Sequence, residues 1–243
     1  MNKRGNPLGY KYDINVIMEI ERKHTQFKHP SNILVVGMSG SGKTELIRRI
    51  LKSYELQFYN LNKPRIKVLW SYGQWHSLID INLSENVDVI YEEGIPAMEQ
   101  IEQIKPDIIV IDDLLFEMNK QKDFENIFIK KSHHLNISVI FSVQNLFYNS
   151  KSMRTISLNC HYIILMKNPR DKTQIASLAR QIYSSNMNFL IDAYNDATQS
   201  AYGYIRIDLS PDTPEEYRVM SRITPDEVNN RGIIPILYKP KYV

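Results

Sequence analysis

The chain has 243 residues, 43% of them hydrophobic and 23% charged, with a formal net charge of +3. This composition excludes an intrinsically disordered protein, which needs fewer apolar residues and a larger net charge, and the length suits one α/β domain with small extensions. The single cysteine, Cys160, excludes an internal disulfide framework and a cysteine-based zinc site. We expect it to be a buried, small apolar residue.

The weak basic excess permits contact with nucleic acid but does not argue for it. No apolar run reaches the ~20 residues that a membrane helix needs. The basic N-terminus is not followed by the apolar segment of a secretory signal, and one cysteine fits a reducing compartment. We therefore expect no membrane-spanning segment and a location in the cytoplasm or nucleus.

Residues 1–30 are polar and charged, and we assign them to an N-terminal arm outside the core. Apolar residues at helical spacing predict a short helix over residues 13–24. From its place beside the main domain, this arm could contact a neighbouring subunit.

Short apolar runs then alternate with stretches of helical periodicity. The expected strands are residues 32–36, 67–72, 107–111, 137–143, 161–166 and 202–209. The expected helices are residues 45–54, 98–104, 124–134 and 172–183. Nearly continuous Val/Ile/Leu runs are typical of strands covered on both faces. The alternation predicts a three-layer α/β sandwich with a mainly parallel sheet over residues 31–209. The Pro-rich residues 210–243 are expected to form a C-terminal extension that crosses the surface without adding to the core.

A glycine-rich segment after the first strand matches the phosphate-loop (Walker A) pattern G-x-x-x-x-G-K-S/T. Glycines let successive N–H groups point at phosphate oxygens, and the following helix adds its positive dipole end. Lys43 is expected to reach the β- and γ-phosphates of ATP, and the Thr44 hydroxyl to ligate Mg²⁺. The expected nucleotide-binding residues are Gly37, Met38, Ser39, Gly40, Ser41, Gly42, Lys43, Thr44 and Glu45. The motif alone indicates nucleotide binding and not hydrolysis.

A second acidic site follows the third expected strand, in the sequence I-I-V-I-D-D. Because ligands bind at the carboxyl ends of parallel strands, Asp112 is expected to ligate Mg²⁺ as a Walker B residue. Asp113 is expected to polarise the attacking water. The alternative for Asp113 is a helix N-cap. An acid directly after the Walker B aspartate is usual in RecA-like (ASCE) ATPases, so we predict a P-loop NTPase of that branch.

Three further residues are candidates for catalysis. Gln144 follows the fourth strand, where an amide can contact the γ-phosphate or its water, although it could also serve only the loop backbone. Ring ATPases take a positive group from a neighbouring subunit to stabilise the transition state. Arg154 is the first candidate for this role and Arg170 the second, with a surface or helix-cap ion pair as the alternative for each.

Beyond these motifs, five segments resemble the poxvirus-type genome-packaging ATPases of the FtsK/HerA branch. These segments are H-H-L-N-I-S-V-I-F-S-V-Q-N-L-F at 133–147, R-T-I-S-L-N at 154–159, H-Y-I-I-L at 161–165, N-P-R-D at 168–171, and Y-G-Y-I-R-I-D-L at 202–209 with Pro214. The resemblance covers about residues 31–228, and within the family it points to the ATPases of Polinton-like and adintovirus-like elements.

The resemblance implies an ATPase that translocates double-stranded DNA into a preformed viral capsid. It implies a homo-oligomeric ring, with capsid vertex or portal-like proteins as partners, acting where virions assemble in the host cytoplasm or nucleus, with virion association left open. Lys43, Thr44, Asp112, Asp113 and Gln144 would take the roles described above. One departure is that the family commonly has Asp-Glu where this chain has two aspartates, which moves the second carboxylate by one methylene.

Two other classes compete with a motor. A P-loop phosphotransferase, such as a nucleoside or nucleotide kinase, should carry a cluster of arginines in a lid, and only Arg154 lies between the fourth and fifth strands. A non-hydrolysing nucleotide-binding module would not need the paired acids Asp112 and Asp113 or the amide Gln144. An ABC-type ATPase is disfavoured because the chain has no Leu-Ser-Gly-Gly sequence.

Overall fold

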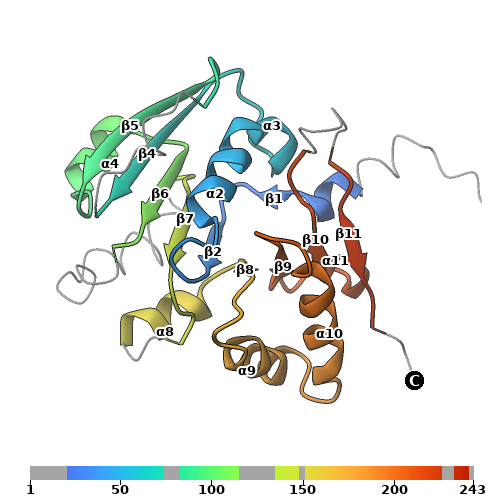
Figure 1. Cartoon of the computed structure of the whole chain (residues 1–243). Helices are drawn as coiled ribbons and strands as arrows, with labels where there is room; N and C mark the ends of the chain where they lie inside the picture. The colour runs from blue at the N-terminus through green and yellow to red at the C-terminus, as the bar shows by residue number, and fades with distance from the viewer. Residues whose placement is uncertain (1–20, 74–82, 115–134, 148–150, 226–232, 241–243) are drawn as a thin grey trace, which may run out of the picture.

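A twisted sheet runs through the centre of the molecule (Figure 1). The computed structural model describes residues 21–73, 83–114, 135–147, 151–225 and 233–240. The strands within these ranges are β1 (Phe27–Lys28), β2 (Asn32–Val36), β3 (Phe58–Tyr59), β4 (Ile66–Tyr72), β5 (Val87–Glu93), β6 (Ile108–Asp112), β7 (Ser138–Val143), β8 (Tyr162–Met166), β9 (Tyr204–Asp208), β10 (Val219–Ser221) and β11 (Ile236–Tyr238).

Nine of the described strands form one sheet in the order β11-β10-β9-β8-β2-β7-β6-β4-β5. The six strands from β8 to β5 are parallel to one another, whereas β9, β10 and β11 each run antiparallel to their neighbours. A separate parallel pair joins β1 to β3. The predicted mainly parallel α/β sheet is therefore confirmed. The edge strand β5 was not predicted, because charged residues interrupt its apolar pattern.

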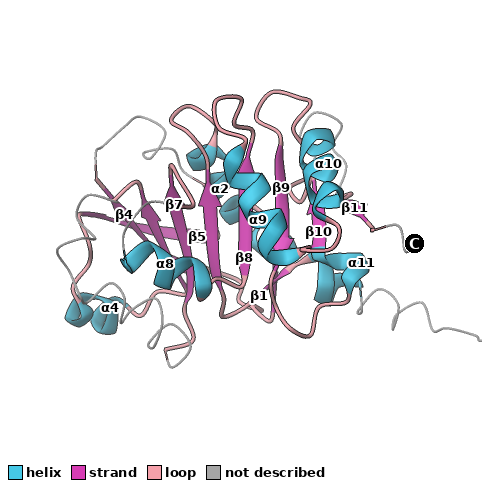
Figure 2. Ribbon diagram, turned by 90° about the horizontal axis from the view of Figure 1, so that it is seen from below, coloured by secondary structure: helices cyan, strands magenta, loops and turns pink. Residues whose placement is uncertain are grey.

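Helices cover both faces of the sheet (Figure 2). Those in the described ranges are α2 (Lys43–Lys52), α3 (Tyr54–Gln57), α4 (Met98–Ile104), α8 (Lys151–Leu158), α9 (Thr173–Ile182), α10 (Met187–Ala197) and α11 (Glu215–Arg218). The predicted helices at 98–104 and 172–183 correspond to α4 and α9, while α8 and α10 were not predicted. Residues 21–25 are helical, and the rest of the helix predicted at 13–24 lies outside the described residues, as does the one at 124–134.

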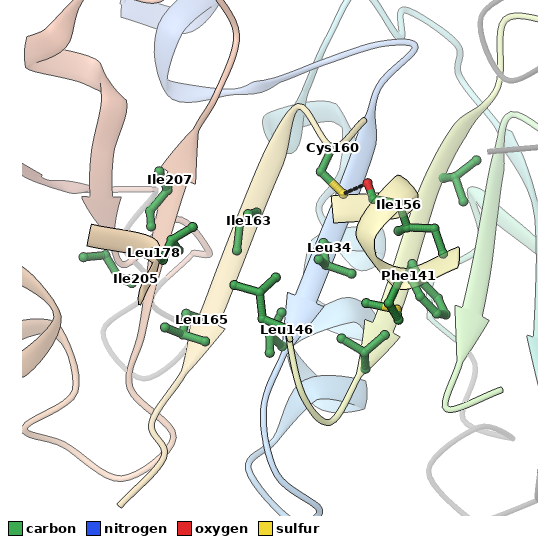
Figure 3. Packing of buried hydrophobic residues seen from close by; sticks show 14 of the residues in the cluster. Leu34, Phe141, Leu146, Ile156, Cys160, Ile163, Leu165, Leu178, Ile205 and Ile207 are labelled. Atoms are coloured by element: carbon green, nitrogen blue, oxygen red, sulfur yellow. Dashed lines mark hydrogen bonds between the residues drawn. The ribbon is translucent and has the colours of Figure 1, made fainter. Parts of the chain in front are cut away.

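Alternate residues of each strand face opposite sides of the sheet and build two cores. In β2, Leu34 and Val36 belong to the core beneath α8, α9 and α10, whereas Ile33 and Val35 belong to the core beneath α2 and α3. The first core appears in Figure 3. It includes Cys160, which is buried as predicted and whose Sγ lies 3.2 Å from the Ile156 carbonyl oxygen. These two cores create the predicted three-layer sandwich.

Both ends of the described chain contribute to the core, contrary to the sequence interpretation. Phe27, in the predicted arm, is 1% exposed and packs its ring 4.9 Å from that of Tyr162. Val219 and Met220, in the predicted surface extension, are fully buried because β10 pairs with β9 inside the sheet. A three-residue strand and a two-residue strand are too short to show the periodicity on which such predictions depend.

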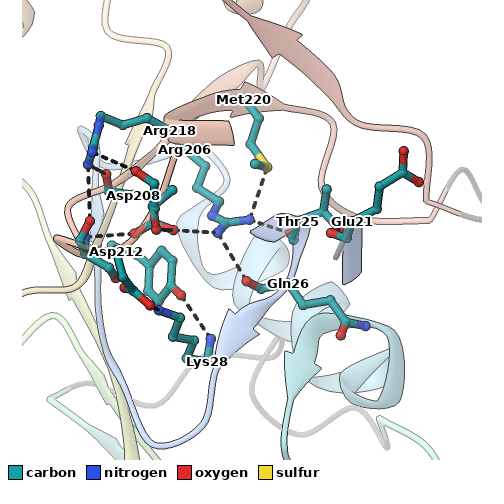
Figure 4. A network of polar contacts seen from close by, with 12 residues as sticks. Glu21, Thr25, Gln26, Lys28, Arg206, Asp208, Asp212, Arg218 and Met220 are labelled. Atoms are coloured by element: carbon teal, nitrogen blue, oxygen red, sulfur yellow. Dashed lines mark hydrogen bonds and ion pairs between the residues drawn. The ribbon is translucent and has the colours of Figure 1, made fainter. Parts of the chain in front are cut away.

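A buried arginine connects these two ends (Figure 4). Arg206 of β9 is fully buried, and its guanidinium group lies over the rings of Phe27 and Tyr162, 4.8 and 4.7 Å from their centroids. It donates hydrogen bonds to the Thr25 and Gln26 carbonyl oxygens at 2.5 and 3.2 Å. The Arg206 side chain therefore fixes the segment before β1 against the β9–β10 hairpin.

Candidate nucleotide-binding site

The phosphate-loop sequence forms the turn between β2 and α2, as predicted. Gly40 and Gly42 have φ angles of 75° and 93°, in the left-handed region that glycine adopts without strain. Gly37 is needed for a different reason, because a Cβ atom there would lie 2.5 Å from Ser41 Oγ and 2.7 Å from Met166 Cβ. The Gly37 N–H donates to the Val143 carbonyl at 3.0 Å, which fixes the loop to the end of β7.

The Lys43 side chain contacts the backbone of this loop. Its side chain is buried, and Nζ donates to the carbonyl oxygens of Gly37 at 2.7 Å and Met38 at 3.2 Å. Burial lowers the pKa of the Lys43 ammonium group, while the carboxylates of Asp113 and Asp112 act in the opposite direction. A buried cation held only by carbonyl oxygens and two nearby acids is suited to receive an anion.

The end of β6 brings the predicted magnesium ligands together. The Thr44 hydroxyl donates to Asp112 Oδ2 at 3.0 Å. The Asp112 side chain is buried, with 5% of the residue exposed. In the sheet, β7 lies between β2 and β6, so the phosphate loop and the acid reach each other across the end of one intervening strand.

That intervening strand supplies Gln144. In the register of the sheet, Asp112 pairs with Ser142, so Asp113 and Gln144 directly follow neighbouring strand ends. Gln144 Nε2 lies 3.3 Å from Oδ1 and 3.1 Å from Oδ2 of Asp113. Both residues are exposed at this edge, and Asp113 has a left-handed φ of 57°. The helix that Asp113 would cap in the alternative interpretation falls outside the described residues.

The donor set fits a nucleoside triphosphate with Mg²⁺. Ser41 Oγ, inside the loop, is buried and has no hydrogen-bond partner, so it remains available to a phosphate oxygen. The described residues contain no group of three or more His, Cys, Asp or Glu side chains that could hold a metal alone. Magnesium typically takes one or two protein oxygens and completes its shell with phosphates and water, and Thr44 with Asp112 would provide that pair.

The remaining predicted residues lie at the surface. Arg154 on α8 and Arg170 after β8 are both exposed, as a group that reaches a neighbouring subunit must be. Asp171, the neighbour of Arg170 in the chain, accepts hydrogen bonds from Thr173 and Gln174. Glu45 is exposed and forms a 2.7 Å ion pair with Arg48, within α2. The roles of Arg154, Arg170 and Glu45 stay predictions.

A residue that sequence reasoning did not select also borders the loop. A Cβ atom on Gly42 would lie 3.1 Å from Cδ1 of the Tyr202 ring. No local pattern signals this contact, since 160 residues of chain separate a tyrosine in a turn from the phosphate loop.

The fold is similar to that of several solved structures. No protein-family model and no curated protein sequence matches the chain. The structure is similar to the DNA-packaging ATPase B204 from Sulfolobus Turreted Icosahedral Virus, with 13% identity and a TM-score of 0.49 over 88% of this chain and 100% of that one. For B204 from Sulfolobus turreted icosahedral virus 2 in complex with ATP-gammaS, the identity is 15% and the TM-score 0.45 over 87% and 98% of the two chains.

A third similar structure is the flagellar accessory protein FlaH from Methanocaldococcus jannaschii, with 16% identity, a TM-score of 0.44, and coverage of 60% of this chain and 76% of FlaH. At these identities the similarities concern only the arrangement of the fold. The chemistry of the site rests on the contacts described above. In the described residues, no helix combines the length and apolar character required to cross a membrane.

Proposed function

We propose that this chain hydrolyses ATP with Mg²⁺ and uses the energy to move double-stranded DNA into a preformed viral capsid. The observation that supports ATP hydrolysis is the hydrogen bond between Thr44 and Asp112, beside a second, exposed hydrogen-bonded pair, Asp113 and Gln144. A binding module needs the first pair only. The second pair adds an acid and an amide where the terminal phosphate and a water molecule would meet.

Each side chain has a distinct task in this proposal. Lys43 exchanges the Gly37 and Met38 carbonyls for phosphate oxygens, which are stronger acceptors for its ammonium group. Thr44 and Asp112 would hold Mg²⁺, which when bound neutralises charge that develops on the phosphates.

Asp113 accepts the proton of the attacking water, and its hydrogen bonds from Gln144 orient the carboxylate. Because Gln144 directly follows β7, a change at the terminal phosphate would reach the centre of the sheet through this residue. An amide at this place is thus suited to report hydrolysis to the rest of a motor.

The DNA-translocating part of the proposal is supported by the sequence resemblance to genome-packaging ATPases. In a homo-oligomeric ring around DNA, Arg154 or Arg170 of one subunit would stabilise the transition state at the next subunit's site. Both arginines are exposed and free of the core, as this role requires. Capsid vertex or portal-like proteins would be the further partners, and the host cytoplasm or nucleus the place of action.

The test is ATP turnover by the full chain with and without long double-stranded DNA. A packaging motor should hydrolyse ATP faster when DNA is added, and Lys43→Ala should lose both nucleotide binding and turnover. Turnover that is indifferent to DNA and increases with a small phosphate acceptor would replace the motor by a phosphotransferase. ATP binding without any turnover would leave only a nucleotide-binding module.

A further inference from the structure

Tyr202 is an exposed aromatic residue placed against the phosphate loop. A Cβ atom on Gly42 would lie 3.1 Å from Cδ1 of Tyr202, and 3.6 Å from both its Cβ and its Cγ. Gly42 directly precedes α2, so the tyrosine ring borders the end of the helix that faces the phosphates. The residue remains 66% exposed, so much of its surface is accessible to a ligand.

The turn that carries Tyr202 is held firmly. The Lys167 N–H donates to the Gly203 carbonyl at 2.8 Å, and its ammonium group donates to the carbonyls of Gln199 and Ser200 at 2.9 and 3.3 Å. Gly203 packs so closely that a Cβ atom there would lie 2.5 Å from the Ala197 carbonyl oxygen. The turn after α10 is therefore pinned to the end of β8.

Tyr202 itself has a φ angle of 58°, in the left-handed region. A bulky side chain rarely adopts this conformation, which is unfavourable by about 1–3 kcal/mol for a non-glycine residue. Glycine or asparagine would suit this position better for stability. The surrounding structure thus keeps an aromatic ring at a strained position beside the phosphate loop, which is the kind of site where strain accompanies function.

We propose that Tyr202 is a nucleotide-positioning residue whose ring stacks on the base of the bound nucleoside triphosphate. This inference rests on the proposed nucleotide binding at Lys43. A base is joined to its phosphates through a single ribose, so a base whose phosphates occupy the loop must lie close to it. An aromatic ring offers little to a phosphate but stacks on the π-face of any base.

The Tyr202 ring should therefore contribute to the binding of a nucleotide but not to the binding of inorganic polyphosphate. Because stacking is tolerant of base identity and stronger for larger rings, the contact should favour purine over pyrimidine triphosphates. Gly42 is part of the same arrangement, since a Cβ atom at that position would lie 3.1 Å from Cδ1 of Tyr202 and crowd the ring.

The experiment measures equilibrium binding of ATP, CTP and inorganic tripolyphosphate, each with Mg²⁺, to the wild type, Tyr202→Ala and Tyr202→Phe. Stacking on a base contributes enough that Tyr202→Ala should weaken ATP binding about tenfold. Tyr202→Phe should bind ATP like the wild type, and tripolyphosphate should bind all three proteins equally. A matched control is Leu56→Ala, another exposed apolar side chain, on α3, which should change no affinity.

Each other result overturns the proposal. If Tyr202→Ala weakens ATP and tripolyphosphate binding equally, Tyr202 shapes the phosphate loop and does not contact the base. If Tyr202→Phe loses as much ATP affinity as Tyr202→Ala, the hydroxyl and not the ring makes the contact. If ATP affinity is unchanged in Tyr202→Ala, there is no contact. A wild type that binds neither ATP nor tripolyphosphate refutes nucleotide binding itself, which separates that failure from the failure of the stacking contact.

Discussion

The Thr44 hydroxyl donates a hydrogen bond to Asp112 across 3.0 Å, although 68 residues separate the two along the chain. Thr44 is the second residue of α2, directly after the phosphate loop, and Asp112 ends β6. Their oxygens meet only because both β2 and β6 end at the same edge of the parallel sheet. If this pair holds a metal, loss of the Asp112 carboxylate should impair hydrolysis.

Asp112→Asn should lower kcat for ATP hydrolysis by about a hundredfold or more, because metal ions contribute several kcal/mol to transition-state stabilisation. The amide keeps the shape and can still pair with Thr44, so the fold should be unchanged. Steady-state turnover against Mg²⁺ concentration measures the effect, and EDTA should abolish wild-type turnover. Asp88→Asn, at an exposed ion pair with Arg65, is the control. Wild-type kinetics in Asp112→Asn would exclude a metal role.

Asp113→Asn should lower kcat about 10²–10⁴-fold, the usual contribution of a general base, with little change in ATP affinity. Gln144→Ala should have a smaller effect in the same direction, since Gln144 acts on Asp113 through the hydrogen bonds of 3.1 and 3.3 Å. The double variant should be no worse than Asp113→Asn alone, because the two residues act as one unit. Turnover that survives in Asp113→Asn would show that another group activates water.

Arg154→Ala should be inactive alone but should regain turnover when mixed with Lys43→Ala subunits, provided the arginine serves a neighbouring site. In mixed rings, an intact Lys43 site can receive Arg154 from the other kind of subunit. Turnover is measured across mixing ratios, with Arg170→Ala in a parallel series and Arg180→Ala, an exposed arginine of α9, as the control. If no ratio restores activity for Arg154→Ala, its action between subunits is refuted.

Arg206→Ala should lower the free energy of unfolding by about 3–5 kcal/mol, the range for removing one partner from a buried ionic network. Its guanidinium group lies 3.6 Å from Asp208 and over two aromatic rings. Arg206→Lys should recover little, because an ammonium group cannot stack and donate in the same plane. Denaturant unfolding measures both. Arg65→Ala, from an ion pair exposed by more than half on each side, should lose under about 1 kcal/mol. Equal losses for Arg206 and Arg65 would contradict this role.

Acid should destabilise the protein through His29. Burial lowers the pKa of its imidazole below the ordinary value of about 6.5, with Asp107 opposing the shift and Lys63 adding to it. Between the folded and unfolded pKa values the unfolded chain binds more protons, so the free energy of unfolding falls as the pH drops below about 6.5. His24, whose pKa burial also lowers, acts in the same direction.

The measurement is denaturant unfolding at several pH values between 7 and 5. His29→Gln should reduce the slope by up to about 1.4 kcal/mol per pH unit, the linkage of one proton. Comparison of slopes removes any constant loss of stability in the variant. A slope that is the same in His29→Gln and in the wild type would assign the acid sensitivity to other groups.

The sequence by itself determined the phosphate loop and the strand that ends in Asp112. Each of those features is local, because its pattern spans only a few consecutive residues. The patterns are the glycine spacing, a lysine and a threonine at the start of a helix, and continuous apolar runs. The same locality made the parallel sheet predictable. It also made the position of Gln144 at a strand end predictable.

Only the tertiary structure decided which distant residues meet. The strand order places β7 between β2 and β6, and this brings Gln144 within hydrogen-bond distance of Asp113. Pairing of the three-residue β10 with β9 buries a segment that we expected at the surface. The tertiary structure also buries Arg206 and places Tyr202 beside Gly42. Such contacts depend on how strands are ordered and on which face each side chain takes, and short-range propensity carries no information about either.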